Sequence, residues 1–318
     1  MMPFFNAFGK LKVFPLLLII SLISSVAFAQ DLPCGSAIVN NRAMALDPAK
    51  AELQRKLHQE ALDFTSTFNS LNRGAPKVIP VVVHVIHDGG PENISKDQVL
   101  DAIETINKDF SMVNSDLNMI VDDFVGIVGN PQVEFRLAQK DPNGNCTEGI
   151  TRTRSALTFD AGENVKQLIS WNTSMYLNIW VVDNLSNGAG GYSYYPGNAP
   201  GQYAEGIVVR NSQFGGIGES NGGNFSRRTL THEIGHYLNL AHTWGSTNEN
   251  AVESNCSSDD GVSDTPNTIG SDQNCVVAQE TCGSLDNIQN YMDYSNCGRM
   301  FTQGQAARMN SALSSNDG

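Results

Sequence analysis

Residues 231–243 read Thr-His-Glu-Ile-Gly-His-Tyr-Leu-Asn-Leu-Ala-His-Thr, and this stretch decides the fold of the chain. On a helix, His232 and His236 lie one above the other and can offer ring nitrogens to one metal ion. Glu233 leans over the same side, where it can act as a general base on a water at that ion. The opposite side carries the apolar residues Leu230, Ile234, Tyr237, Leu238 and Ala241. The pattern predicts a buried helix with a core face and a catalytic face.

The third histidine requires a reversal of the chain. His242 comes six residues after His236, which is not a whole number of helical turns, so a continuous helix would carry it to another face. We therefore expect the helix to end between them. Asn239 is well placed for the bend, because asparagine tolerates the left-handed conformation better than most residues other than glycine.

The first 29 residues have the order of a secretory signal peptide. Lys10 and Lys12 precede the apolar run 13–23, and the small-residue pattern Ala-Phe-Ala ends at Ala29, where we expect cleavage. An N-terminal membrane anchor is the alternative, but the apolar run is too short to span a bilayer. We predict an exported protein that has no membrane association after signal removal.

The charge of the chain disfavours nucleic acid as a partner. Removal of the signal peptide with its two lysines changes the formal net charge from -13 to -15, with 18 basic against 33 acidic residues. Such a surface repels nucleic acid and anionic lipid. We expect protein or peptide substrates, and the sequence does not fix the oligomeric state.

Six cysteines are present, and four of them fall within the last third of the chain. In an exported protein such clustering favours disulfides over a metal site. Four cysteines allow three pairings, and their spacing does not choose among them. The cysteines are Cys34, Cys146, Cys256, Cys275, Cys282 and Cys297.

Alternating strand and helix patterns predict an α+β fold with an α/β-type upper half above a loop-rich, disulfide-tied lower half. Residues 30 to about 75 form a separate segment, with a helix over 48–68 and a linker over 69–76. A helical extension packed on the domain is the alternative. We expect strands over 78–87, 132–138, 176–182, 192–195 and 206–210, and helices over 95–110 and 165–169.

Three motifs in order resemble the pappalysin (cytophagalysin, ulilysin-like) family of metzincin metalloproteases. After the histidine motif come Asp-Gly-Val-Ser-Asp-Thr-Pro at 260–266 and Asn-Tyr-Met-Asp-Tyr at 290–294. The stretch Met-Phe-Thr-Gln-Gly-Gln-Ala-Ala-Arg-Met at 300–309 completes the set. The resemblance extends from Lys77 to the C-terminus. It implies a metzincin-like zincin fold, in which a twisted mixed sheet and the active-site helix form the upper half.

The resemblance also implies roles for individual residues. Zinc would be held by His232, His236 and His242, with Glu233 as the general base. Tyr294 would donate a hydrogen bond to the oxyanion that forms during peptide hydrolysis. Met292 would form the Met-turn below the metal.

In the lower half, the resemblance implies calcium bound by Asp260, Thr265 and the carbonyl of Ser263. A solvated turn is the alternative. It also implies disulfides that pair Cys256 with Cys282, and Cys275 with Cys297. The chain departs from the characterised members after Tyr294, where the segment is short and Asn296 offers no charge, so their preference for arginine after the cut should not be transferred.

Two hypotheses concern Cys34, which precedes the catalytic region. It can act as a cysteine switch, with its thiolate on the open zinc position until the pro-segment is removed. Alternatively, it forms a disulfide with Cys146.

We predict a signal peptide at 1–29, a pro-segment at 30–76 and a metalloprotease domain at 77–318. The function expected is that of a secreted zinc metalloendopeptidase made as a proenzyme, with zinc and calcium as its metal ions. A non-catalytic binding or adhesion module on the same scaffold is the main alternative, and a zinc aminopeptidase is another.

Overall fold

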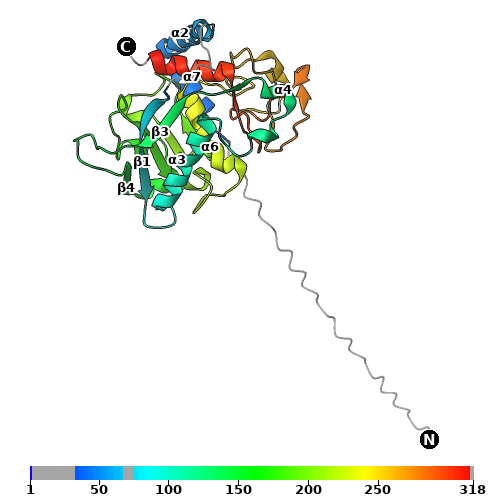
Figure 1. Ribbon diagram of the computed structural model, residues 1–318. Coiled ribbons are helices and arrows are strands. Elements are labelled where there is room, and N and C mark those ends of the chain that lie inside the picture. Colours follow the sequence, from blue (N-terminus) through cyan, green and yellow to red (C-terminus); the bar gives the residue numbers. More distant parts are fainter. Residues whose placement is uncertain (2–32, 67–74, 316–318) are drawn as a thin grey trace. The chain divides into compact units, whose positions relative to one another are not determined.

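The structure is a computed structural model that describes residue 1 and residues 33–66 and 75–315 (Figure 1). Apart from Met1, the expected signal peptide lies outside the described residues, as does almost all of the expected linker. The helices are α1 (Ser36–Leu46), α2 (Pro48–Thr65), α3 (Lys96–Phe110), α4 (Asp122–Val125), α5 (Glu163–Lys166), α6 (Asn224–Tyr237) and α7 (Gln303–Ser315). The strands are β1 (Lys77–His87), β2 (Val128–Gly129), β3 (Val133–Leu137), β4 (Ile150–Arg154), β5 (Leu177–Val182), β6 (Gly191–Ser193), β7 (Ile207–Arg210), β8 (Glu280–Thr281), β9 (Ser284–Leu285) and β10 (Phe301–Thr302).

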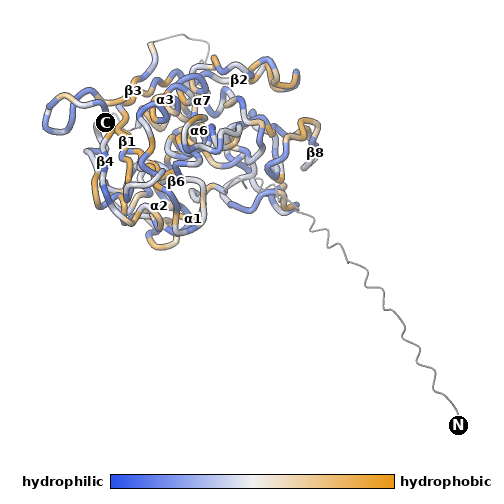
Figure 2. Tube along the Cα trace, turned by 90° about the horizontal axis from the view of Figure 1, so that it is seen from below, coloured by the Kyte–Doolittle hydropathy of each residue, from blue (hydrophilic) through white to orange (hydrophobic). Residues whose placement is uncertain are grey.

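A six-stranded mixed sheet has the order β3-β1-β5-β7-β6, and its sixth strand, β4, pairs with β1 beyond the end of β3. The long strand β1 pairs in parallel with β3 along Lys77–Val81 and with β4 along Val83–His87. β5 and β7 continue the parallel pairing, whereas β6 is antiparallel to β7 and forms the edge. Because β1 is rich in valine and isoleucine and is central, its second half, Val81–Ile86, is fully buried, and the strand is coloured hydrophobic in Figure 2.

One face of the sheet packs on α3 and α6. Alternate residues of the strands point to this face, among them Val83 and Ile179, and they meet Ile106 of α3 and Ile234 of α6. All four side chains have no exposed surface. Truncation of one such residue to alanine costs about 2–5 kcal/mol, so this layer fixes α6 firmly under the sheet.

The N-terminal helices pack on the same unit of the chain, which extends from Asp31 to Gly318. α1 covers the other face of the sheet at its β6 edge, where Val39 and Ala43 contact a cluster that contains Trp180 and Tyr192. α2 lies against α7, side by side with it in Figure 1. The described part of the expected pro-segment is therefore a packed extension of the domain.

The lower half, from Leu238 to Met300, contains short elements only, such as β8 and β9. Two disulfides cross it, as described below. This agrees with the predicted fold: a twisted, mostly parallel sheet above a loop-rich half tied by disulfides.

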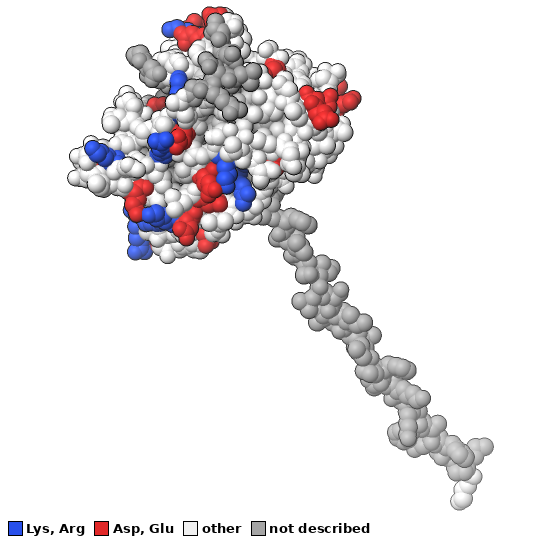
Figure 3. All heavy atoms as spheres, viewed as in Figure 1, with Lys and Arg blue, Asp and Glu red and all other residues white. Residues whose placement is uncertain are grey.

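The surface carries charges of both signs. On the face drawn in Figure 3, basic side chains lie among acidic ones. Exposed pairs include Arg154 with Asp88 at 2.9 Å and Lys96 with Glu148 at 2.6 Å. Exposed ion pairs are each worth about 0–1 kcal/mol, so the apolar layers carry most of the stability.

Most predicted elements are present, with shifts at their ends. The helix expected at 165–169 spans Glu163–Lys166, and the one expected at 48–68 is described up to Thr65. Helices α1 and α7 and strand β4 were not predicted, because α1 carries two asparagines and an arginine and β4 alternates threonine with arginine. Within residues 33–66 and 75–315, none of the helices has the length and hydrophobicity needed to cross a bilayer.

Candidate active site

The end of α6 brings the three histidines together. The helix stops at Tyr237, and Asn239 adopts a φ of 73°. The Leu240 amide donates to the Gly235 carbonyl and the Asn239 amide to that of His236, both at 2.9 Å, which caps the helix and reverses the chain. The predicted left-handed bend is present. As a result the Nε2 atom of His236 lies 3.1 Å from Nε2 of His232 and 3.2 Å from Nε2 of His242.

The outer nitrogens of the three rings are all anchored to backbone carbonyls. Nδ1 of His232 donates to the Tyr291 carbonyl at 2.7 Å, and Nδ1 of His236 to that of Leu240 at 2.7 Å. Nδ1 of His242 donates to the Thr247 carbonyl at 2.9 Å. A neutral imidazole that donates from Nδ1 has a lone pair on Nε2, so three acceptors face one another without a proton between them.

This arrangement fits a metal ion. Burial lowers the pKa of His232 to about 4 and holds the pKa values of His236 and His242 well below their usual range, so all three rings are neutral at pH 7. Three converging lone pairs of buried rings require a cation between them. In zinc sites, the histidine ligands typically donate their other ring N–H to a carbonyl or carboxylate, as these three do. The three histidines and Cys34 have their ligand atoms within 4.8 Å of one another.

Glu233 is fully buried beside the histidines. Its Oε2 atom accepts from the Ser36 hydroxyl at 2.7 Å, whereas Oε1 has no partner. Burial raises its pKa to about 7. Gly191 lies against this side chain, since a Cβ atom there would come within 3.1 Å of the Glu233 Cγ atom. A carboxyl whose pKa is near neutral can accept and return a proton at physiological pH.

The structure places Cys34 at the histidines and not near Cys146. The Cys34 thiol is buried, Cys146 is exposed, and neither forms a disulfide, so the alternative pairing of the two is absent. Burial and the nearby Glu233 carboxylate raise the pKa of the Cys34 thiol. A thiolate at this position therefore needs a cation beside it.

Met292 and Tyr294 both lie next to the histidine motif. Met292 is fully buried under α6, and a Cβ atom on Gly235 would come within 2.3 Å of its sulfur, so the glycine is required for this contact. The Tyr294 ring packs 4.9 Å from the ring of His242, and its hydroxyl donates to Asn248 at 3.4 Å. Tyr294 therefore lies beside the histidine rings, and Met292 lies beside the helix that carries two of them.

Two of the residues expected to bind calcium, Asp260 and Thr265, are in direct contact. The hydroxyl of Thr265 donates to Asp260 at 2.7 Å, and both side chains are buried. Burial raises the pKa of Asp260 to about 7. Ser263 is exposed. The pair offers a buried carboxylate and a hydroxyl, which are oxygen donors of the kind that calcium prefers.

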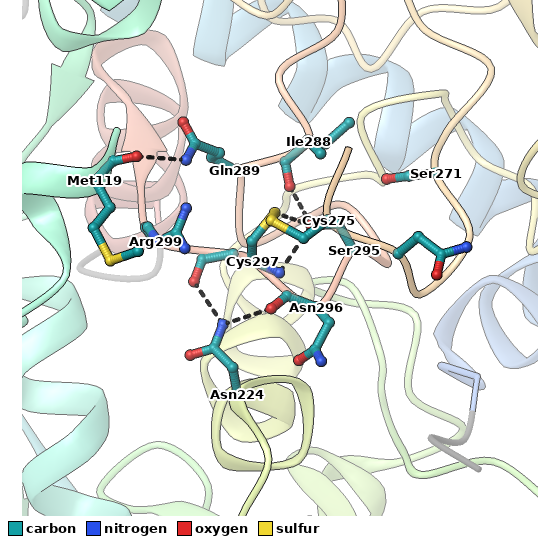
Figure 4. Close-up of a disulfide and its surroundings, with 12 residues drawn as sticks. Met119, Asn224, Ser271, Cys275, Ile288, Gln289, Ser295, Asn296, Cys297 and Arg299 are labelled. Carbon is teal, nitrogen blue, oxygen red and sulfur yellow. Dashed lines mark hydrogen bonds between the residues drawn. A yellow bond between two sulfur atoms is a disulfide. The ribbon is translucent and has the colours of Figure 1, made fainter. Parts of the chain in front are cut away.

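Both disulfides join the cysteines that the resemblance pairs: Cys256 with Cys282, and Cys275 with Cys297. Figure 4 shows the second of these. Next to it, the Asn224 amide at the start of α6 donates to the carbonyl of Asn296 at 3.2 Å. The disulfide therefore ties the segment after Met292 to Cys275, and hydrogen bonds of Asn296 hold the same segment against the beginning of the active-site helix.

Sequence reasoning missed three polar residues that the structure brings to the site. Ser36 and Asn40 come from α1, and Asp109 comes from the end of α3. All three are buried. Polar residues inside an apolar helical pattern were the only signal available, and they do not identify a partner more than 100 residues away.

The comparisons with known proteins agree on one family. A Peptidase_M43 profile, described as Pregnancy-associated plasma protein-A, matches residues 161–314. An extracellular metalloprotease of Trichophyton verrucosum is 30% identical over 261 residues, which covers 78% of this chain and 84% of the relative. Another, of Arthroderma otae, is 31% identical over 238 residues and covers 73% and 76%.

Solved structures of similar proteins come from Tannerella forsythia. A mutant of promirolysin is 32% identical, with a TM-score of 0.75, and the match covers 88% of this chain and 92% of that one. Mature mirolysin in complex with a cleaved peptide is 36% identical, with a TM-score of 0.66, and covers 74% and 91%. The pro-form thus matches more of this chain than the mature form.

Proposed function

Because the chain belongs to the Peptidase_M43 (pappalysin) family of metzincin metalloproteases, we propose that His232, His236 and His242 hold its zinc and that Glu233 is its general base. The chain is a secreted zinc-dependent metalloendopeptidase made as a proenzyme. The single observation that carries the assignment of residues is the convergence of three neutral, carbonyl-anchored imidazoles beside a buried carboxylate.

Zinc, when bound, polarises the scissile carbonyl and lowers the pKa of an attacking water. Glu233 takes up the proton of that water at its free Oε1 atom and returns it to the leaving nitrogen. The phenol of Tyr294 donates to the oxyanion.

The peptide substrate pairs with the edge strand β6. The pro-segment already does so, since the Gly35 amide donates to the Gly191 carbonyl at 2.8 Å and the Gly190 amide donates to the Pro33 carbonyl at 2.9 Å. An edge strand with free backbone groups can accept an extended chain in this manner. Removal of the pro-segment frees these groups for the substrate.

The pro-segment, residues 30–76, keeps the enzyme latent through Cys34 and Ser36. The Cys34 sulfur takes the position beside the three histidine nitrogens. The Ser36 hydroxyl accepts from the Ser193 amide at 2.8 Å and donates to Glu233, so it bridges the edge strand and the general base. Both contacts block groups that the reaction needs. Signal cleavage after Ala29 precedes this step, and the catalytic domain begins at Lys77.

Calcium stabilises the lower half through Asp260 and Thr265, together with the carbonyl of Ser263. A buried carboxylate with its pKa raised to about 7 lacks enough compensating charge, and a calcium ion would supply it. Thermal unfolding with calcium and with a chelator tests this.

Activity on a peptide blocked at both ends tests the function. The processed, zinc-loaded protein should cut it internally, a chelator should abolish cleavage, and added zinc should restore it. Cleavage of free peptides only from the amino end would indicate an aminopeptidase. A zinc-loaded protein that cuts none of a broad peptide library would indicate a non-catalytic module.

A further inference from the structure

Asp109, near the end of α3, joins two segments of the zinc site. Its side chain is 3% exposed. Its Oδ2 atom accepts from the Thr231 hydroxyl at 2.7 Å, and its Oδ1 atom accepts from the Tyr291 phenol at 2.8 Å. Thr231 belongs to α6 and directly precedes His232, and Tyr291 directly precedes Met292.

The contact with Tyr291 leads directly to a histidine. The phenol of Tyr291 is held by Asp109, and its backbone carbonyl accepts from Nδ1 of His232 at 2.7 Å. Tyr291 therefore connects the Asp109 carboxylate to the ring of His232 through one residue. The Thr231 hydroxyl, one residue before the same histidine on α6, also donates to Asp109. Asp109 thus contacts both the residue that precedes His232 and the residue that accepts a hydrogen bond from its ring.

A carboxylate is required at this position. Three donors converge on it, because Arg228 Nε also lies 3.3 Å from Oδ1. An asparagine has one acceptor oxygen and two N–H donors, so it leaves a donor unpaired or faces Arg228 with another donor. The guanidinium, which also lies 5.4 Å over the Tyr291 ring, supplies the charge that compensates the buried carboxylate.

The structure offers a matched control in Asp116. Asp116 is the second acidic residue that pairs with Arg228, and it accepts from Nη1 and Nη2 of the guanidinium at 2.8 Å each. The Asp116 side chain forms hydrogen bonds or ion pairs with Arg228, Asn114 and Arg299, and none of these bonds involves Thr231, Tyr291 or His232. Loss of the Asp116 charge perturbs the same arginine but leaves the hydrogen bonds of Asp109 to Thr231 and Tyr291 in place.

We propose that Asp109 is a positioning residue for the zinc ligand His232, and that it sets the affinity of the site for zinc through Tyr291 and Thr231. This rests on the proposed role of His232 as a zinc ligand. Groups that orient a metal-binding histidine typically change metal affinity by about 10–100-fold when removed.

The test measures zinc binding by the full-length chain after removal of metal, by competition with a chelating dye. Asp109→Asn should weaken zinc binding by about 10–100-fold, whereas Asp116→Asn should leave it within about threefold of the unsubstituted chain. Tyr291→Phe, which removes the phenol but keeps the carbonyl, should weaken binding by several fold. Thermal unfolding of the metal-free proteins is recorded in parallel.

The proposal is overturned if Asp109→Asn lowers the unfolding temperature but binds zinc like the unsubstituted chain, since its role is then structural alone. If Asp109→Asn does not fold, Tyr291→Phe and Thr231→Val decide, because neither removes a charge. Unchanged zinc affinity in both would overturn the proposal. A chain that binds zinc in no variant, the unsubstituted one included, would refute the proposed zinc site itself.

Discussion

Replacement of Ser36 by alanine should make the intact proenzyme active. The Ser36 hydroxyl donates to the Glu233 carboxylate at 2.7 Å and accepts from the Ser193 amide at 2.8 Å. The variant keeps Cys34 and the whole linker. In the variant, the Ser193 amide and the Oε2 atom of Glu233 both lose their hydrogen bond to Ser36. The Oε1 atom of Glu233 has no partner in either form.

The size of the effect follows from the two hydrogen bonds. A hydrogen bond to a charged group contributes about 1.5–3 kcal/mol, and a neutral one about 1 kcal/mol. Docking of the pro-segment should therefore weaken by about 2–4 kcal/mol. Each 1.4 kcal/mol is tenfold, so the undocked, active population should rise by about 30-fold to several hundredfold.

The assay is the initial rate on a blocked peptide, with mass spectrometry to verify that the proenzyme chain is uncut. Ser66→Ala is the control, because the exposed Ser66 hydroxyl donates to the Asp63 carbonyl, away from the site. After pro-segment removal, all forms have the same sequence and should have the same rate. The reasoning is refuted if Ser36→Ala stays as latent as the unsubstituted proenzyme while Cys34→Ala is active.

Three further predictions follow from the site and the lower half. Glu233→Gln should lower kcat by about 10²–10⁴-fold with zinc content unchanged, as measured by metal analysis beside kinetics; equal kcat would exclude it as the base. Replacement of Cys256 and Cys282 by serine should destabilise the folded state by about 3–4 kcal/mol, given their separation of 26 residues, as measured by denaturant unfolding. Because the pKa of Asp260 is raised to about 7 in the folded state, the unfolded state loses this proton first, and stability without calcium should fall as pH rises from about 4 to 7 and then level off. Asp260→Asn should remove up to about 4 kcal/mol of that decline in unfolding titrations, and an unchanged pH profile would refute the assignment.

Several features of the protein followed from the sequence alone. The spacing of His232, Glu233 and His236 places them on adjacent parts of one helix, and the position of His242 demands a bend, which Asn239 makes. These are local consequences of helical geometry. The valine-rich strand β1 and the helix capped by Ser95 were predictable for the same reason, since the Ser95 hydroxyl accepts from the Gln98 amide at 3.1 Å.

The partners of buried polar groups were decided only by the tertiary structure. The sequence left Cys34 open between a switch and a disulfide with Cys146, and the packing of α1 on the β6 edge places its sulfur at the histidines. Ser36 meets Glu233, and Asp109 meets Tyr291, across 197 and 182 residues of chain. No periodic pattern in the sequence predicts contacts between residues so far apart in the chain. These contacts result from how the apolar faces of the sheet and the helices pack together.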